Sequence, residues 1–328
     1  MDFPTGVLII TPQYVTNSVL ENWYTAPYSK LDELFEQTYQ ITHQHFKRHI
    51  TLYIPGSHFP SISITGTQCQ LNCQHCNSHF LHQMDPVTQP TELVNYCQKL
   101  AKRNGTGCLI SGGCDSDGTV PLAPFLPALT KIKQSTNLYL NVHTGFLNYT
   151  MAHQLAKTNI DCASVDVVGD ERTLHEIYGL THRSIEDYTT TLKALKSSQL
   201  SVAPHVCVGL YHGQLSGELS ALQIIHSNIQ PRLLVIIALM STSGTRLANT
   251  TPVNPVDVAR VCALARLRFP KCEIALGCMR PRGAVRRQME QLAIKAGITR
   301  LVLPTRSTIK YLEENQFTLS TKRACCVV

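Results

Sequence analysis

The pattern of apolar and polar positions changes near residue 56. Before it, residues 31–46 carry apolar side chains at roughly helical spacing, with charged residues between them, which predicts a helix within an N-terminal extension, residues 1–55. From Ile62 onward, short β-branched runs alternate with helical patterns, which is typical of β-α units around a parallel sheet. We predict a main domain over residues 56–318 and a C-terminal tail over 319–328.

The repeated pattern predicts an α/β barrel. Eight strands are expected to begin near Ile62, Gly107, Leu138, Asp161, Ser201, Arg232, Cys272 and Arg300. The helical patterns between and after them span 91–103, 121–133, 149–157, 185–196, 218–227, 255–269, 284–295 and 308–315. Eight such units close naturally into a (β/α)8 TIM-type barrel, although six units with two additional ones would have the same pattern.

Hydropathy and charge exclude some classes of protein. The longest apolar run, residues 233–240, has the length of a strand, and residues 1–10 lack a basic start, so neither a membrane span nor a signal peptide is predicted. We therefore expect a cytoplasmic protein with no membrane partner. The 29 Lys and Arg against 22 Asp and Glu give a net charge of +7, without the basic stripe expected of a nucleic-acid-binding protein.

Thirteen cysteines are more than a cytosolic enzyme needs for packing, and metal binding explains them better than disulfides do. Cys69, Cys73 and Cys76 follow the first strand, on the face where barrel active sites lie. Thiolates suit iron-sulfur clusters or zinc, but tetrahedral zinc needs a fourth ligand, and His75 is poorly placed to supply one. Three thiols without a fourth indicate a cluster with one open iron, and a structural zinc site is the alternative.

The C-x3-C-x2-C spacing after strand one resembles the signature of the radical S-adenosylmethionine (SAM) superfamily. The resemblance implies that Cys69, Cys73 and Cys76 hold a 4Fe-4S cluster whose open iron chelates SAM. It also implies one-electron cleavage of SAM to a 5'-deoxyadenosyl radical, with electrons from a donor such as ferredoxin or flavodoxin. His75 stands where members of this superfamily usually carry an aromatic residue.

Three further segments would lie on the same face of the barrel. On strand two, Gly112 and Gly113 resemble the Gly-Gly-acidic element that holds the SAM amino group, with Cys114 displacing the acid to Asp115. After strand four, the candidates for the SAM ribose are Asp166 and Asp170, either of which could instead cap the next helix. After strand seven, the candidates for a contact with substrate, SAM or cluster are Arg280 and Arg282.

The eight-unit pattern, the N-terminal extension and residues 277–282 resemble the biotin synthase branch of this superfamily. Biotin synthase carries a second, two-iron cluster, but Asn141 and Ala203 stand where two of its thiols belong. The sequence is more similar to one subunit of the two-protein, archaeal-type lipoyl synthase, through residues 63–66, 111–113, 142–145, 166–170 and 277–281.

That likeness implies sulfur insertion into an octanoyl chain on a lipoyl-type carrier protein, together with a homologous radical SAM partner. The alternatives are a biotin synthase-like or methylornithine-forming enzyme acting on a small molecule, and a non-catalytic zinc-binding barrel. The likeness also implies a second 4Fe-4S cluster as the sulfur source, for which Cys114 and Cys278 are the favoured ligands. A mobile tail is the main expectation for Cys325 and Cys326, which could act as ligands only if the tail folds back.

Overall fold

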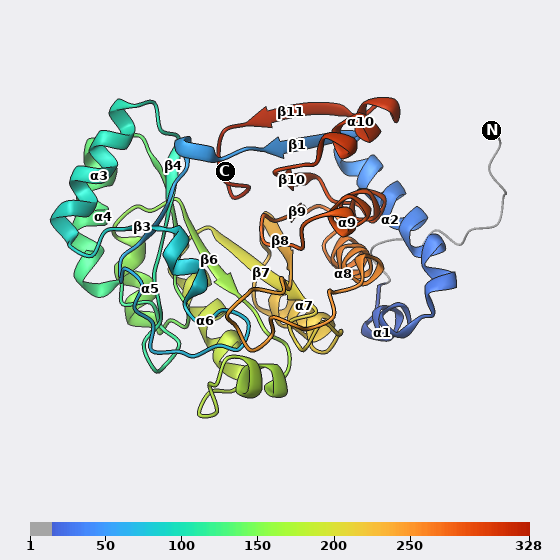
Figure 1. Ribbon diagram of the computed structural model, residues 1–328, viewed down its shortest axis with the longest axis horizontal. Helices are drawn as coiled ribbons and strands as arrows, with labels where there is room; N and C mark the ends of the chain where they lie inside the picture. The colour runs from blue at the N-terminus through green and yellow to red at the C-terminus, as the bar shows by residue number, and fades with distance from the viewer. Residues whose placement is uncertain (1–14) are drawn as a thin grey trace.

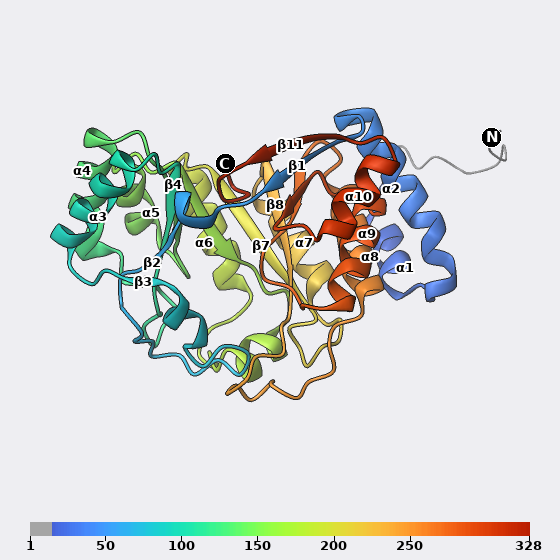
Figure 2. The ribbon, with the colours of Figure 1, turned by 45° about the horizontal axis from the view of Figure 1, so that its top comes forward.

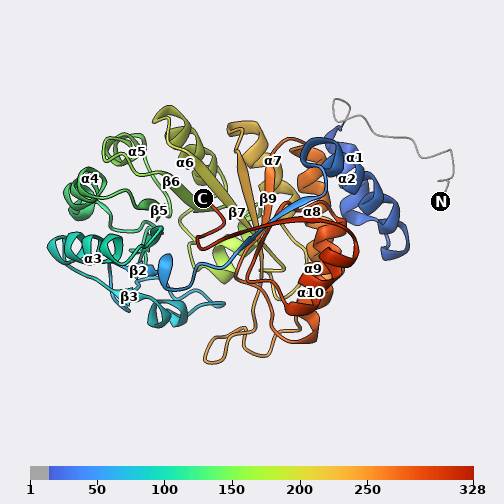
Figure 3. The ribbon, with the colours of Figure 1, turned by 90° about the horizontal axis from the view of Figure 1, so that it is seen from above.

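The computed structural model describes residues 15–328, and one parallel sheet of eleven strands runs through it. The strand order is β11-β1-β10-β9-β8-β7-β6-β5-β4-β2-β3. The sheet curls into a half-barrel, and helices α3 to α10 form an arc on its convex side (Figure 1, Figure 3). Because β3 and β11 are its two edges, the strand ladder does not close on itself within residues 15–328.

The strands are β1 (His49–Tyr53), β2 (Ser61–Ser63), β3 (Asp85–Pro86), β4 (Gly107–Ser111), β5 (Tyr139–His143), β6 (Cys162–Asp166), β7 (Val202–Val208), β8 (Leu233–Ala238), β9 (Glu273–Leu276), β10 (Arg300–Val302) and β11 (Thr318–Lys322). The α-helices are α1 (Asn17–Thr25), α2 (Leu31–Phe46), α3 (Pro90–Lys102), α4 (Leu126–Ser135), α5 (Tyr149–Ala156), α6 (Glu186–Ser197), α7 (Glu218–Asn228), α8 (Pro255–Arg268), α9 (Ala284–Lys295) and α10 (Arg306–Glu314). A short π-helix, η6 (Thr173–Ile177), follows β6.

The predicted TIM-type α/β fold is confirmed, with β2 and β4 to β10 as the eight predicted strands and α3 to α10 as the predicted helices. The structure adds β1, β3 and β11. β1 lies within the predicted extension, and β11 crosses the boundary predicted at residue 319, yet the two pair along the top of the sheet (Figure 2). β11 is a polar edge strand with no buried residue, so it lacks the apolar pattern by which a strand is recognised.

The helix predicted at residues 31–46 is α2, which packs against α8 and α9. Its Thr42 hydroxyl donates to the Gly297 carbonyl at 3.2 Å, and the buried Arg266 guanidinium donates to the same carbonyl at 2.9 Å. Gly297 has φ +97°, and a Cβ there would lie 2.4 Å from the Thr42 hydroxyl, so the close approach requires glycine. The extension is thus fastened to the main sheet, while its first 14 residues lie outside the described part of the chain.

The two faces of β5 to β7 differ in polarity. Successive side chains of a strand point to opposite faces. The outward ones join the large core beneath the helices: Leu140, Val142, Ala163, Val165, Val206 and Val208. The inward ones include a group that we call the polar wall: Asn141, His143, Ser164, Asp166 and His205. Closed barrels fill their interior with branched aliphatic side chains, so a polar inner surface indicates a binding face.

A separate apolar cluster, here the apolar floor, covers the rest of the concave face. It consists of Tyr53, Cys162, Ala203, Leu233, Val235, Ala275, Val302, Cys326 and Val327. The C-terminal tail therefore contributes to the interior, and the expectation of a mobile tail is wrong. The hydroxyl of Tyr53 donates to the Val328 carbonyl at 2.9 Å, and that of Tyr139 donates to the Val327 carbonyl at 3.0 Å. The C-terminus lies inside the arc of helices (Figure 3).

Within residues 15–328, none of the helices combines the length and the apolar character that crossing a bilayer requires.

Candidate active site

The three-cysteine loop is fastened to the carboxyl end of the sheet by backbone hydrogen bonds. The Gln70 amide donates to the Cys114 carbonyl after β4 at 2.8 Å, and the Gln74 amide donates to the Ile177 carbonyl of η6 at 2.7 Å. The Leu247 amide, between β8 and α8, donates to the Gln74 carbonyl at 3.2 Å. Three separate segments thus hold the loop over the ends of the strands.

The thiols of this loop interact electrostatically. Cys73 is buried, and Cys69 and Cys76 are partly exposed. Burial is the main cause that raises the pKa of the Cys73 thiol, and the charges of Cys76 and Cys69 raise it further. Burial and then the charge of Cys69 raise the pKa of Cys114 to about 12. Four thiols therefore share one neighbourhood, and a bound metal would have to displace their protons.

The donor set fits an iron-sulfur cluster in chemical type, because thiolates are its usual ligands. No three His, Cys, Asp or Glu side chains within residues 15–328 already stand in a metal-binding arrangement, so the loop is not a finished coordination shell. The backbone around the three-cysteine loop restricts the sequence more narrowly than the thiols do. The Gly113 amide donates to the Thr65 hydroxyl at 2.7 Å, and a Cβ on Gly113 would lie 2.0 Å from the Gln68 carbonyl. Only glycine allows β4 to approach the cysteine loop this closely.

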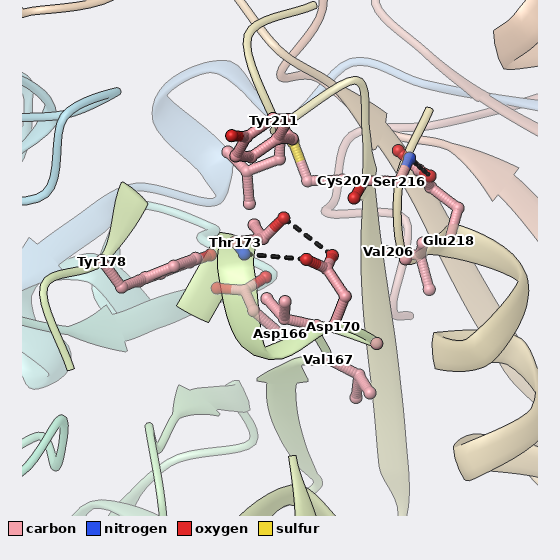
Figure 4. Close-up of a pocket in the computed structure, with 14 residues that line it drawn as sticks. Asp166, Val167, Asp170, Thr173, Tyr178, Val206, Cys207, Tyr211, Ser216 and Glu218 are labelled. Atoms are coloured by element: carbon pink, nitrogen blue, oxygen red, sulfur yellow. Dashed lines mark hydrogen bonds between the residues drawn. The ribbon is translucent and has the colours of Figure 1, made fainter. Parts of the chain in front are cut away.

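Two predicted carboxylates are used within turns. Asp115 accepts hydrogen bonds from the amides of Asp117 at 3.0 Å and Thr119 at 2.9 Å. Asp170 accepts from the Thr173 amide at 2.8 Å and from its hydroxyl at 2.7 Å, which is the capping role that the sequence left open (Figure 4). The oxygens of both residues already bind protein donors, which leaves them less available to a ligand.

Asp166 differs from these two. It is exposed at the end of β6, and its carboxylate accepts no hydrogen bond from residues 15–328. It lines a pocket with Tyr178, Cys207 and Tyr211 (Figure 4). Burial is the largest cause that raises the pKa of Tyr178 and of Cys207, and the negative charge of Asp166 is the second. Of the two candidates after β6, Asp166 is the carboxylate available for a ligand.

Tyr211 and Glu218 also line the pocket. The guanidinium of Arg172 lies 3.9 Å from the centre of the Tyr211 ring, and the Tyr211 hydroxyl donates to Glu176 at 2.9 Å. The buried Glu218 accepts from the Gly209 amide and the Tyr24 hydroxyl, each at 2.8 Å. The only sequence signal for Tyr211 is its place directly after β7, in a glycine-containing turn.

The two predicted arginines after β9 differ in environment. Arg280 is 1% exposed; its guanidinium donates to Glu290 at 2.5 Å and to the Val302 carbonyl at 2.7 Å. These contacts join α9 and β10 to the end of β9, and they do not support the ligand contact expected for Arg280. Arg282 is exposed.

The two cysteines proposed for a second cluster have different thiol neighbours. Burial is the largest cause that raises the pKa of both thiols. The second cause is the charge of Cys69 for the Cys114 thiol, and the charge of Cys325, in the tail, for the Cys278 thiol. Cys278 is exposed to solvent. Cys114 thus belongs with the three-cysteine loop and Cys278 with the tail.

Among curated proteins, the chain is similar to biotin synthases. The chain is 28% identical over 247 residues to the biotin synthase of Synechococcus elongatus, covering 72% of this chain and 74% of that protein. It is 24% identical over 295 residues to the biotin synthase of Vibrio cholerae, covering 85% and 79%. No protein-family model matches.

Two solved structures share the fold. Methylornithine synthase has a TM-score of 0.67 at 14% identity, covering 94% of this chain and 96% of that one. The FeFe-hydrogenase maturase HydG from Carboxydothermus hydrogenoformans has a TM-score of 0.68 at 14% identity, covering 95% and 78%. At this identity the likeness shows a common half-barrel architecture.

Proposed function

We propose that this chain, a radical SAM enzyme similar to the biotin synthases, holds a 4Fe-4S cluster through Cys69, Cys73 and Cys76. The observation that carries the proposal is the three-thiol loop, which three segments hold at the carboxyl end of the sheet. The chemistry supplied by bound cluster and SAM is one-electron cleavage of the sulfonium, which yields a radical able to abstract hydrogen from an unactivated carbon.

The residues around the loop have separate tasks in this proposal. Gly112 and Gly113 let the backbone after β4 approach the SAM amino group. Asp166, whose carboxylate is exposed in the pocket, binds the ribose hydroxyls, as acids at strand ends do in other nucleotide sites. Asp115 and Asp170 shape the turns that hold these groups, through the amides that they bind. Arg282 remains a candidate for a contact with the substrate.

The proposed reaction is sulfur insertion into an octanoyl chain on a lipoyl-type carrier protein, with a homologous radical SAM partner and a ferredoxin- or flavodoxin-type electron donor. The sequence segments shared with lipoyl synthase subunits support this reaction. The apolar floor supports it too, because an alkyl chain needs an apolar surface. The proposal includes a second 4Fe-4S cluster as the sulfur source, with Cys278 and the nearby tail thiol Cys325 as its first ligands to test.

A second candidate is a biotin synthase-like reaction on a small molecule. The curated relatives described above favour it, because they are named biotin synthases. The polar wall favours it as well, since it offers hydrogen bonds that a bare alkyl chain cannot use. Both candidates need the same radical chemistry and differ in the substrate.

The experiment is anaerobic reconstitution with iron and sulfide, followed by reduction in the presence of SAM. We expect about four irons for the loop site and formation of 5'-deoxyadenosine. The control for variants of the loop cysteines is Cys262→Ala, which removes a buried thiol of α8. Its iron content and its formation of 5'-deoxyadenosine should equal those of the unaltered protein. Stable zinc binding without cleavage of SAM would contradict the proposal. Mass gain from sulfur on an octanoylated lipoyl-domain peptide, compared with dethiobiotin, then separates the two candidate reactions.

A further inference from the structure

The N-terminal extension reaches the border of the pocket through one side chain. Helix α1 packs against α7 and α8, and its Leu20 is fully buried. Near the end of α1, the hydroxyl of Tyr24 donates a hydrogen bond of 2.8 Å to Glu218, the first residue of α7. The two residues are 194 positions apart in the chain, and Glu218 lines the pocket. This bond therefore connects the extension to the pocket.

The backbone of Tyr24 is held by α8. The guanidinium of Arg260, on α8, is 4% exposed, and it donates to the Tyr24 carbonyl and, at 3.4 Å, to the Trp23 carbonyl. These carbonyls belong to the last turn of α1, where helical carbonyls lack partners within the helix and a cation is favourable. Arg260 thus fixes the position from which Tyr24 reaches α7.

Glu218 fastens the turn that forms one side of the pocket. One of its carboxylate oxygens accepts from the Gly209 amide at 2.8 Å. The other accepts from the Ser216 amide, also at 2.8 Å, and from the Tyr24 hydroxyl (Figure 4). The two amides stand near the start and the end of the turn after β7, and the turn between them carries Tyr211 into the pocket lining. One carboxylate therefore holds both ends of this turn.

The turn depends on these contacts because its backbone is strained. His212 has φ +51°, a conformation that residues other than glycine rarely adopt. Such a backbone persists only where its surroundings determine it. On the side of the loop after β6 the packing is already tight, since a Cβ on Gly217 would lie 2.4 Å from the Asp170 carboxylate. The remaining constraint on the turn comes from Glu218.

The Glu218 carboxylate is stabilised by hydrogen bonds. Burial is the largest cause that raises its pKa, and the bonds from the two amides and from Tyr24 lower it. The titratable groups beside it are the Tyr24 hydroxyl, Cys207 on β7 and Asp170 after β6, while the Arg260 cation on α8 is directed at the Tyr24 carbonyl. A buried carboxylate without a cationic partner relies on its donors. Tyr24 supplies the one donor that comes from outside the turn.

We propose that Tyr24 is a positioning residue for the pocket: its hydroxyl holds the Glu218 carboxylate, and through it the turn that carries Tyr211. Tyr24 itself does not line the pocket, so it acts through Glu218. The N-terminal extension is then a working part of the binding site. This inference rests on the proposed function for SAM as the ligand of the pocket.

The test compares Tyr24→Phe with Tyr28→Phe, because each variant loses one hydroxyl of the N-terminal extension. The Tyr28 hydroxyl donates to Asp257 at 2.9 Å, away from the turn, which makes it the matched control. In Tyr24→Phe we expect the Kd of the reconstituted enzyme for SAM, measured calorimetrically, to rise about tenfold, since a less populated turn lowers the apparent affinity. The KM for SAM should rise while kcat stays unchanged. An unchanged Kd in Tyr24→Phe, or an equal rise in Tyr28→Phe, overturns the inference.

A double-mutant cycle and a pH profile separate positioning from a general loss of stability. Glu218→Gln should weaken SAM binding, and adding Tyr24→Phe to it should change the Kd by less than about twofold, because both act through one carboxylate. Loss of the Tyr24 hydroxyl removes a cause that lowers the Glu218 pKa, so SAM affinity should begin to fall at a higher pH in Tyr24→Phe. Independent effects of the two changes, or identical pH profiles, would contradict the positioning role.

Hydrogen exchange distinguishes failure of this inference from failure of the proposed function. In the absence of SAM, the amides of residues 209–218 should exchange faster in Tyr24→Phe than in the unaltered protein, and Tyr28→Phe should not change them. If the unaltered protein does not bind SAM, the proposed function is wrong, and faster exchange confined to this turn still supports its positioning by Tyr24. If exchange in this turn is the same in all three proteins, the inference is wrong, whether or not SAM is cleaved.

Discussion

Two groups of thiols in the half-barrel have opposite surroundings. At the carboxyl ends of the strands, Cys69, Cys73 and Cys76 lie on a loop held by backbone hydrogen bonds, with the Cys114 thiol nearby. At the apolar floor, Cys162 and Cys326 pack among aliphatic and aromatic side chains. The residue type is the same, but the first group occupies a polar loop next to a pocket, whereas the second fills space in a core.

This difference shows that the number of cysteines is a poor guide to metal sites. Free cysteine is among the most buried residue types and packs as a small apolar side chain. Thiols become candidates for metal binding where the backbone places several of them on one loop with room for a ligand. In TIM-type barrels that place is the carboxyl end of the strands, while the opposite end serves stability.

The largest expected effect comes from removing the loop thiols. The Cys69→Ala, Cys73→Ala, Cys76→Ala variant should lose cleavage of SAM completely, because no ligands for the loop cluster remain. Iron and sulfide analysis after reconstitution checks the loss, and the iron that remains measures a second cluster. Unchanged cleavage of SAM would contradict the assignment of the loop. A variant without any iron would contradict the second cluster.

A smaller effect, on stability, is expected at the buried ion pair of Arg280 and Glu290, which follows β9. Glu290→Ala leaves the buried Arg280 without its carboxylate, which typically costs about 3–5 kcal/mol in the free energy of unfolding. The control is Glu314→Ala, which breaks an exposed pair with Lys310 and should cost below about 1 kcal/mol. Denaturant unfolding measures both. Equal costs would show that Arg280 does not depend on Glu290.

The polar wall between the two regions should make stability depend on pH. Burial lowers the pKa of His205 to about 4, so below pH 6.5 the unfolded chain takes up a proton that the folded protein resists. Stability is therefore lost as the pH falls from about 6.5 towards 4, and one such histidine costs about 2 kcal/mol at pH 5. Between pH 7 and pH 5, the unfolding free energy of His205→Gln should therefore fall by about 2 kcal/mol less than that of the unaltered protein. His82→Gln, at an exposed position, is the control, and identical pH profiles would refute this cause.

The smallest effect is expected at the floor itself. Cys326→Ser places a hydroxyl among apolar side chains, which costs about 1–3 kcal/mol if the hydroxyl finds no partner. The melting temperature should fall, while cleavage of SAM per loop cluster stays unchanged. Loss of cleavage in a variant that still folds would mean that the floor thiols take part in the chemistry.

The repeating units and the thiol loop could be predicted from the sequence because both are local patterns. β2, β4 to β10 and the helices that follow them have the apolar periodicity of their own residues, and the spacing of Cys69, Cys73 and Cys76 is visible without a fold. The polar edge strand β11 has no such pattern, and β1, which carries the buried Ile50 and Leu52, lies outside the repeating units. Their place depends on pairing between segments far apart in the chain.

Roles that depend on partners distant in the sequence were decided by the tertiary structure. The sequence could not separate the capping role of Asp170 from the exposed carboxylate of Asp166, or show that Arg280 pairs with Glu290. It could not show that the tail folds back onto Tyr53. A side chain's burial and its hydrogen bonds come from chain segments that only folding brings together. The sequence by itself determined the type of fold and the candidate metal ligands, and the assembled sheet decided which polar groups remain free for a substrate.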